Sequence, residues 1–213
     1  MDIINKETEL YCLTHSDPEP EVLAAINRDT HANLLKPRML SGHFQGRLLS
    51  LISKLVRPRN ILEIGTYTGY SALCLAEGLQ EGGRLYTLEA DEELEGRIRR
   101  NIEIAGKTEN IELIIGPALD IIPTLDIKFD LVFIDADKLN YLNYYKLVIE
   151  KVNIGGVIIS DNVLWSGKVT DETKNDATTQ LLREFNDYLA QDDRTDKVLL
   201  PVRDGLYVSL KTK

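Results

Sequence analysis

From residue 60 onward, short apolar runs alternate with longer amphipathic segments. Residues 131–134 and 157–159 are apolar at every position, which is typical of strands that are covered on both faces. Strands that alternate with helices indicate right-handed crossovers and a parallel sheet with helices on both sides. The expected strands are 60–64, 84–89, 111–115, 129–135, 156–160, 197–202 and 206–210.

The last two expected strands are separated only by Arg203, Asp204 and Gly205, a turn sequence that predicts an antiparallel hairpin. One strand near the C-terminus should therefore run against the others. The predicted fold class is α/β: a Rossmann-like, doubly wound, seven-stranded sheet, mostly parallel, with additional N-terminal helices. Helices are expected at residues 69–79, 92–105, 118–122, 141–152 and 176–190.

The first 57 residues contain no strand pattern. Residues 21–33 and 42–56 instead have helical patterns, and the second has a wide apolar face. We therefore expect a single domain over 1–213, with an N-terminal helical arm at 1–57 and a Rossmann-like core at 58–213. The arm has two candidate roles beyond packing, as a dimer surface or as a lid.

Composition excludes several classes of partner. The chain has 213 residues with 25 basic and 34 acidic side chains, a net charge of −9, which argues against a nucleic-acid partner. The length fits one domain. The two cysteines, Cys12 and Cys74, cannot form a disulfide framework and suit a reducing compartment. Without a signal-like start or a long apolar stretch, we expect a cytoplasmic location and no membrane partner.

The first expected strand ends in a glycine turn, Gly65 to Gly69. Ligands of open parallel sheets bind beyond such strand ends. Gly65 allows a sharp turn and a close backbone approach, and the next strand ends in Glu89, whose carboxylate can accept both hydroxyls of a ribose. Glu63 is expected to face the same cleft. This arrangement predicts a nucleoside site, although glycine turns also follow strands in proteins without ligands.

The spacing of this turn differs from the dinucleotide fingerprint. Tyr67 occupies the place of the second glycine, which makes room for a pyrophosphate in nicotinamide enzymes. The absence of this glycine argues against a dinucleotide. A nicotinamide-dependent oxidoreductase remains an alternative function, and a noncatalytic nucleoside-binding protein is another.

Carboxylates and an amide follow the fourth and fifth strands. Asp135 ends one run, and Asp161 and Asn162 end the next, so neighbouring strands would bring them together. Such oxygen ligands suit Mg²⁺, Ca²⁺ or Mn²⁺, whereas zinc is disfavoured because all three histidines lie in the arm. Lys138 can reach back as a proton acceptor or a positive clamp. The alternative is that the acids cap the following helices.

Four blocks in order resemble a known family, the metal-dependent class I methyltransferases of the caffeoyl-CoA and catechol O-methyltransferase type. The resemblance runs from about residue 39 to 210. It implies S-adenosylmethionine in the glycine-turn cleft, a divalent cation (Mg²⁺ first) on Asp135, Asp161 and Asn162, and a homodimer. The blocks are residues 63–71, 116–119, 135–141 and 161–165.

The resemblance also assigns roles to individual residues. Lys138 matches the family's catalytic lysine, with Asp135 beside it. Acceptor contacts are expected from Met39, Lys138 and Trp165, the last of which has loop anchoring as its alternative role. The implied cofactor contacts are Ser41, Glu63, Gly65, Thr66, Ser71, Glu89, Ala118, Asp135 and Asp137.

The expected reaction is methyl transfer from S-adenosylmethionine to one oxygen of a vicinal diphenol, with the cation holding both oxygens and Lys138 as base. The acceptor stays open among free catechols, caffeate-like acids, flavonoids and CoA thioesters. One departure bears on it: residues 42–46 read Gly-His-Phe-Gln-Gly, where plant enzymes carry Asp-Glu-Gly-Gln. His43 is either an acceptor contact or a helix-surface histidine.

Overall fold

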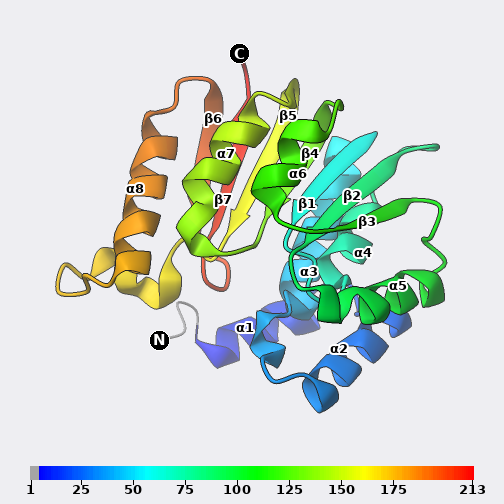
Figure 1. Ribbon diagram of the computed structural model, residues 1–213. Coiled ribbons are helices and arrows are strands. Elements are labelled where there is room, and N and C mark those ends of the chain that lie inside the picture. Colours follow the sequence, from blue (N-terminus) through cyan, green and yellow to red (C-terminus); the bar gives the residue numbers. More distant parts are fainter. Residues whose placement is uncertain (1–4) are drawn as a thin grey trace.

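The computed structural model describes residues 5–213, which form a seven-stranded sheet with helices on both faces (Figure 1). The strand order is β3-β2-β1-β4-β5-β7-β6, and only β7 runs antiparallel to its neighbours. The predicted Rossmann-like fold class is therefore confirmed. The strands are β1 (Asn60–Ile64), β2 (Arg84–Glu89), β3 (Ile111–Ile115), β4 (Phe129–Ile134), β5 (Val152–Asp161), β6 (Thr195–Leu200) and β7 (Leu206–Lys211).

Helices connect the strands and precede the sheet. Both helices expected before the first strand have the predicted bounds, as α2 and α3. The α-helices are α1 (Lys6–Thr14), α2 (Glu21–Asn33), α3 (Gly42–Val56), α4 (Tyr70–Ala76), α5 (Glu95–Ile104), α6 (Ala118–Thr124), α7 (Tyr141–Ile149) and α8 (Ala177–Gln191). Short 3-10 helices are η1 (Pro37–Met39), η2 (Glu92–Leu94), η3 (Lys138–Asn140) and η4 (Trp165–Thr170).

Several element boundaries differ from the sequence-based expectation, and the start of β5 differs most. Helix α7 ends at Ile149 and β5 begins at Val152, so β5 starts four residues earlier than its apolar run. The early start pairs Val152 with Phe129, before an irregularity that precedes the pair Leu131 and Val157. Helix α1 was not predicted because its large apolar side chains, such as Leu10, are exposed. Its N-cap Asn5, which accepts from the Thr8 amide at 2.8 Å, was the available signal.

The sheet has a hydrophobic cluster on each face. Ile61 and Phe133 belong to the cluster that includes residues of α2, α3 and α4, whereas their neighbours Leu62 and Val132 belong to the cluster that includes residues of α6, α7 and α8. All four side chains are fully buried. Adjacent residues of one strand point to opposite faces, so apolar runs without polar alternation fit strands buried on both sides.

The first two helices lie at the edge of the sheet where the parallel strands end (Figure 1). Several side chains fasten this arm to the core. Arg97 of α5 pairs with Asp29 of α2, and the Tyr70 hydroxyl of α4 donates to Glu19, which precedes α2. The arm is therefore placed beside the ligand edge of the sheet. No helix within residues 5–213 is long and apolar enough to cross a membrane.

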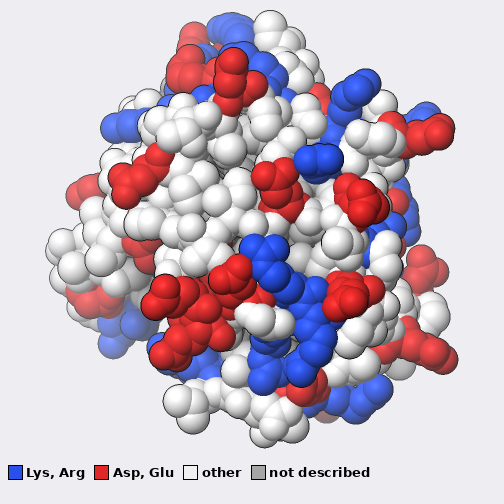
Figure 2. All heavy atoms as spheres, turned by 45° about the vertical axis from the view of Figure 1, so that its right-hand side comes forward, with Lys and Arg blue, Asp and Glu red and all other residues white. Residues whose placement is uncertain are grey.

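Charged side chains of both signs lie on the face shown in Figure 2. Asp and Glu gather in one patch beside a group of Lys and Arg, and elsewhere on this face the two signs alternate. Mixed charge of this kind gives no extended basic field there, as expected from the net charge of −9.

Candidate active site

The glycine turn after β1 makes a close approach, and its nearest neighbour is the protein backbone. A Cβ on Gly65 would lie 2.0 Å from the carbonyl oxygen of Asp135, and Gly65 has a φ of +94°. Its amide donates to the carbonyl of Leu88 on β2 at 2.9 Å. Glycine is therefore needed here because the ends of β1 and β4 touch, a requirement that exists without any ligand.

The carboxylate of Glu89 holds the glycine turn from the end of β2. One oxygen accepts from the backbone amides of Thr66 at 3.2 Å and Tyr67 at 2.7 Å, and the other accepts from the Asp91 amide at 2.9 Å. Tyr67 has a φ of +55°, an uncommon conformation for a tyrosine. Glu89 thus stabilises the glycine turn.

Glu63 is a buried carboxyl group with one unpaired oxygen. Its Oε2 accepts from the Thr87 hydroxyl, whereas Oε1 has no hydrogen-bond partner within the described residues. Burial raises the pKa of Glu63 to about 8. A buried polar atom without a partner is costly, so Oε1 marks a position where a ligand group can bind.

The ends of β4 and β5 bring two aspartates together. Ile134 pairs with Ser160 in the parallel register, so the following residues, Asp135 and Asp161, occupy neighbouring positions. Asp161 is only 2% exposed. Burial, and then the Asp135 carboxylate, raise the pKa of Asp161 to about 7. Two acidic groups in neighbouring positions form a cluster whose negative charge a cation would stabilise.

The oxygen donors of this cluster fit a hard divalent cation. Asn162 follows Asp161 with a φ of +57°, a left-handed conformation that asparagine tolerates, and its backbone amide donates to Oδ1 of Asp161 at 2.6 Å. Residues 5–213 hold no cluster of three or more His, Cys, Asp or Glu side chains arranged for a metal. The set here is two carboxylates and one amide, which is chemistry suited to Mg²⁺, Ca²⁺ or Mn²⁺ with water or substrate completing the coordination.

Lys138 of η3 contacts this carboxylate cluster. Its Nζ donates to Oδ1 of Asp135 at 3.1 Å and to the hydroxyl of Tyr141, and lies 4.4 Å from the centre of that ring. Tyr141 is almost fully buried, and its hydroxyl donates to the Asp161 carbonyl at 2.9 Å. The sequence predicts no role for Tyr141, because the expected helix begins at Tyr141 and leaves Lys138 outside it.

The remaining residues assigned to the cofactor lie around the same edge. Ser41 is buried at the start of α3, Ser71 is buried on α4, and Ala118 begins α6. Asp137 is exposed and precedes η3. Its carboxylate accepts from the Asn140 amide group at 2.9 Å and from a tyrosine hydroxyl of α7, so helix stabilisation, the alternative role for these acids, accounts for part of its bonding.

The residues assigned to the acceptor differ in their surroundings. Met39 is 53% exposed on η1. Trp165 packs partly buried against the cluster beneath α7 and α8, and its Nε1 is buried without a hydrogen-bond partner in the described part of the chain. Asp204 of the β6–β7 turn accepts from the Ser166 amide next to it. Loop anchoring therefore explains the packing of Trp165.

His43 is part of the arm's packing. One ring nitrogen donates to the Asp17 carbonyl at 2.8 Å, in the segment between α1 and α2. The side chain lines a cavity of about 190 Å³ that is bordered by α1, α2 and Ser41. This hydrogen bond supports the structural role of His43.

The fold and the site together define a class of protein: a Rossmann-like methyltransferase, with a glycine turn and a buried acid beside a carboxylate–lysine cluster. The sequence pattern of a family described as O-methyltransferase matches residues 13–212, and the chain belongs to this family. The match reaches further into the arm than the resemblance from about residue 39 had indicated.

Individual relatives agree with the family assignment. The chain is 37% identical over 183 residues to a catechol O-methyltransferase of Niastella koreensis, covering 84% of this chain and 82% of the relative. It is 38% identical over 204 residues to caffeoyl-CoA O-methyltransferase 1 of Arabidopsis thaliana, covering 89% and 78%.

Solved structures show the same fold. The S-adenosylhomocysteine-bound methyltransferase of Podospora anserina has a TM-score of 0.90 at 31% identity, over 99% of this chain and 97% of that one. The O-methyltransferase of Bacillus cereus in complex with S-adenosylhomocysteine has a TM-score of 0.88 at 35% identity, over 96% and 97%.

Proposed function

We propose that this protein transfers the methyl group of S-adenosylmethionine to one hydroxyl of a catechol-type acceptor, with a divalent cation in the active site. The observation that carries the proposal is the juxtaposition at one sheet edge of the buried Glu63 carboxyl group with the Asp135–Asp161–Lys138 cluster. The catechol and caffeoyl-CoA acceptors named for two relatives support the acceptor class, and two structures in complex with S-adenosylhomocysteine support the cofactor.

The cofactor would lie beyond the ends of β1 and β2, as ligands do in sheets of this kind. The unpaired Oε1 of buried Glu63 supports this placement. Glu89 would hold the ribose while it stabilises the turn, and Asp135 would reach the methionine end. The other contacts in this proposal are Ser41, Gly65, Thr66, Ser71, Ala118 and Asp137.

The cation would be held by Asp135, Asp161 and Asn162. When bound, such an ion lowers the pKa of a coordinated hydroxyl and fixes both oxygens of a vicinal diphenol. Mg²⁺ is the cation we propose first, because the oxygen donors suit it and leave room for two acceptor oxygens.

Lys138 would receive the acceptor's proton or hold the resulting anion. A free phenol has a pKa of about 10, so it is mostly protonated and a weak nucleophile at neutral pH. The contacts of Lys138 with Asp135 and Tyr141 hold Nζ in one position beside the carboxylate cluster. A positioned side chain of this kind contributes about 10²–10⁴-fold to a proton-transfer step.

The proposed step conserves atoms and electrons. An acceptor oxygen attacks the methyl carbon, the carbon–sulfur bond breaks, and its electron pair stays on sulfur to give S-adenosylhomocysteine. The hydroxyl proton passes to Lys138 and then to solvent. Most of the rate would come from holding oxygen, carbon and sulfur in line, an effect worth up to about 7–11 kcal/mol.

Met39 and Trp165 are proposed acceptor contacts beside Lys138. Free catechols, caffeate-like acids, flavonoids and CoA thioesters are all candidates, because each class has members that carry a vicinal diphenol. A homodimer and a cytoplasmic location are also part of this proposal. Light scattering on the purified protein tests the dimer.

Neither alternative function is favoured by an observation. Tyr67 fills the place of the pyrophosphate glycine expected in a nicotinamide enzyme. A noncatalytic nucleoside-binding protein would leave the contact between Lys138 and Asp135 without a use.

A product-identifying assay tests the proposal. Purified protein is incubated with S-adenosylmethionine, Mg²⁺ and, in separate reactions, catechol, caffeic acid, a flavonoid with two adjacent hydroxyls, and caffeoyl-CoA. We expect mass spectrometry to find a methoxy product and an equal amount of S-adenosylhomocysteine with at least one acceptor. Absence of both products from every reaction would contradict the proposal.

A further inference from the structure

One fully buried amide connects α3 to the end of β5. Gln45 of α3 is 0% exposed, and its side-chain nitrogen donates to Oδ2 of Asp161 at 2.6 Å. Its side-chain oxygen accepts from the guanidinium of Arg203 at 3.5 Å. The proposed chemistry gives neither Gln45 nor Arg203 a role, yet Gln45 binds Asp161, one of the proposed cation ligands.

The chemistry of its partners fixes the orientation of this amide. An ionised carboxylate only accepts hydrogen bonds, and a guanidinium only donates them. The nitrogen of Gln45 must therefore face Asp161 and its oxygen must face Arg203. Since the Asn162 amide holds Oδ1 of Asp161, both carboxylate oxygens have a protein donor, which fixes the plane of the group.

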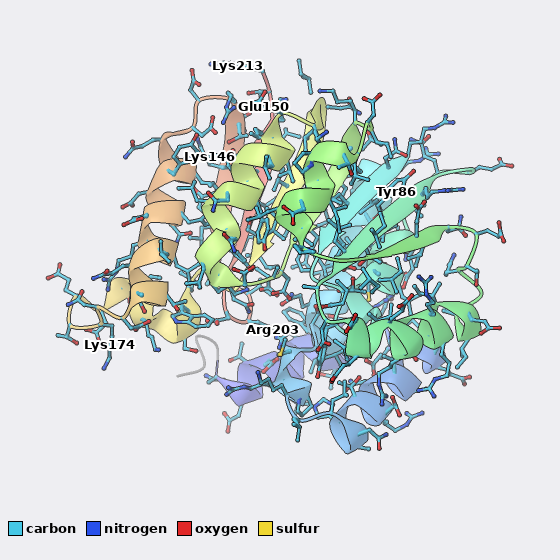
Figure 3. All side chains as sticks on the ribbon, in the orientation of Figure 1. Tyr86, Lys146, Glu150, Lys174, Arg203 and Lys213 are labelled. Carbon is cyan, nitrogen blue, oxygen red and sulfur yellow. The ribbon has the colours of Figure 1, made fainter. Side chains whose placement is uncertain are left out.

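Arg203 extends the contact to the segment before α3. Its guanidinium also donates to the backbone carbonyls of Leu40, at 3.1 Å, and Ser41. Arg203 lies in the β6–β7 turn with a φ of +49°, and Figure 3 shows it at the base of the sheet, near α1. A non-glycine residue keeps such a conformation only where its surroundings stabilise it, as these three acceptors do here.

We propose that Gln45 is a positioning residue that sets the orientation of the Asp161 carboxylate, and that Arg203 couples this orientation to the Leu40–Ser41 segment. The cation pocket and the cofactor side of the cleft are then aligned by one chain of contacts, Arg203–Gln45–Asp161. This inference rests on the proposed function, because it takes Asp161 as a cation ligand.

The residue type at position 45 fits this role. A neutral amide donates to Asp161 without adding a second positive charge to that of Lys138, which would weaken cation binding. It also avoids the third negative charge that a glutamate would add beside Asp135 and Asp161. Partners that orient a metal-ligating carboxylate typically change metal affinity by about 10–100-fold when they are removed.

The first test is Gln45→Met, which keeps the length and helix propensity of the side chain but removes both hydrogen bonds. Mn²⁺ binding is measured on the protein alone, without cofactor or acceptor, from the paramagnetic resonance signal of free Mn²⁺. We expect Mn²⁺ affinity to fall about 10–100-fold and S-adenosylhomocysteine affinity to stay within about twofold. Ser50→Ala is the matched control on α3, because its hydroxyl binds Glu77 away from the site.

Arg203→Met separates positioning from charge. Removing a positive charge near the pocket would by itself tighten cation binding, whereas loss of positioning weakens it. We expect weaker Mn²⁺ binding, together with weaker S-adenosylhomocysteine binding because the Ser41 carbonyl loses its donor. In the Gln45→Met background, Arg203→Met should cause no further loss of Mn²⁺ affinity, since the two residues act in series.

The outcomes are distinct. Unchanged Mn²⁺ affinity in Gln45→Met would overturn the role of Gln45, and additive losses in the double variant would overturn the coupling through Arg203. If Gln45→Met does not fold, the direction of the Arg203→Met effect alone decides, with tighter Mn²⁺ binding as the contrary result. Failure of the wild-type protein to bind Mn²⁺ would instead remove the proposed cation site, and this inference with it.

Discussion

The two halves of the candidate active site are built in different ways. The cofactor half, after β1 and β2, is held mainly by backbone: Gly65 touches the Asp135 carbonyl, and Glu89 binds the amides of the turn. The cation half, after β4 and β5, is held by buried side chains, with Gln45 and Tyr141 binding around Asp161. The first half is held by close contacts between the ends of neighbouring parallel strands, whereas the second depends on side chains that α3 and α7 pack against the end of β5.

The largest expected effect comes from removing the central side chain of the cation half. Asp161→Ala should lower kcat/KM on the order of a thousandfold, because several kcal/mol of charge stabilisation are lost with the cation. Calorimetry should find S-adenosylhomocysteine affinity within about threefold of wild type, since the cofactor half is separate. An equally large loss of cofactor affinity would show that the two halves are one unit.

The cofactor half should respond to a change in backbone instead. Gly65→Ala places a Cβ 2.0 Å from the Asp135 carbonyl oxygen at a φ of +94°, so we expect a loss of at least about 2 kcal/mol in unfolding free energy. Urea denaturation measures this.

A second glycine provides the control for that substitution. Gly96 lies in α5 with open space around its Cβ position, and Gly96→Ala should stabilise the protein by about 0.5–1 kcal/mol. Equal effects of the two substitutions would show that the close approach at Gly65 carries no energetic cost.

Glu63 gives the cofactor half a dependence on pH. Burial raises the pKa of Glu63 from 4.5 to about 8, so the folded protein keeps a proton that the unfolded chain releases. The resulting stability is fully present below about pH 4.5 and is lost as pH rises to about 8, at up to about 1.4 kcal/mol per pH unit. As pH rises between these values, the Glu63→Gln variant should lose less unfolding free energy than wild type. Urea denaturation without cofactor, repeated at each pH, measures this. Parallel pH profiles would contradict the assignment.

A much smaller loss of activity than that of Asp161→Ala is expected from Tyr141→Phe. The ring stays in the core, but Lys138 and the Asp161 carbonyl lose their shared partner. We expect kcat to fall about tenfold with little change in the KM for S-adenosylmethionine, the loss of a single hydrogen bond to a charged group. Steady-state kinetics at saturating Mg²⁺ provides the measurement. A change confined to KM would place Tyr141 in cofactor binding instead.

The same contrast explains what the sequence predicted. Strand periodicity, the glycine turn and the Arg203–Gly205 turn are local patterns, and they were sufficient to predict the seven strands and the reversed β7. The adjacency of Asp135 and Asp161 followed from strand order alone. Helix α1 escaped prediction because exposed Leu10 and Tyr11 disrupt its apolar periodicity.

The contacts that the sequence did not predict join distant residues. Gln45 and Asp161 are 116 positions apart, and Arg203 and Ser41 are 162 apart. No periodicity or spacing specifies which buried amide meets which carboxylate, because that depends on how α3 packs against the sheet. Similarly, the contact between Gly65 and the Asp135 carbonyl depends on the pairing of β1 with β4, which the sequence does not specify.

Cation-dependent methyl transfer is tested most directly by removing and restoring the metal. Formation of S-adenosylhomocysteine and methoxy product is followed with the best acceptor after metal removal by a chelator, and again after Mg²⁺ is restored, for wild type and Asp161→Ala. We predict that wild-type turnover disappears and returns with Mg²⁺, whereas the variant stays inactive throughout. Turnover that persists both without metal and without the Asp161 carboxylate would contradict the claim.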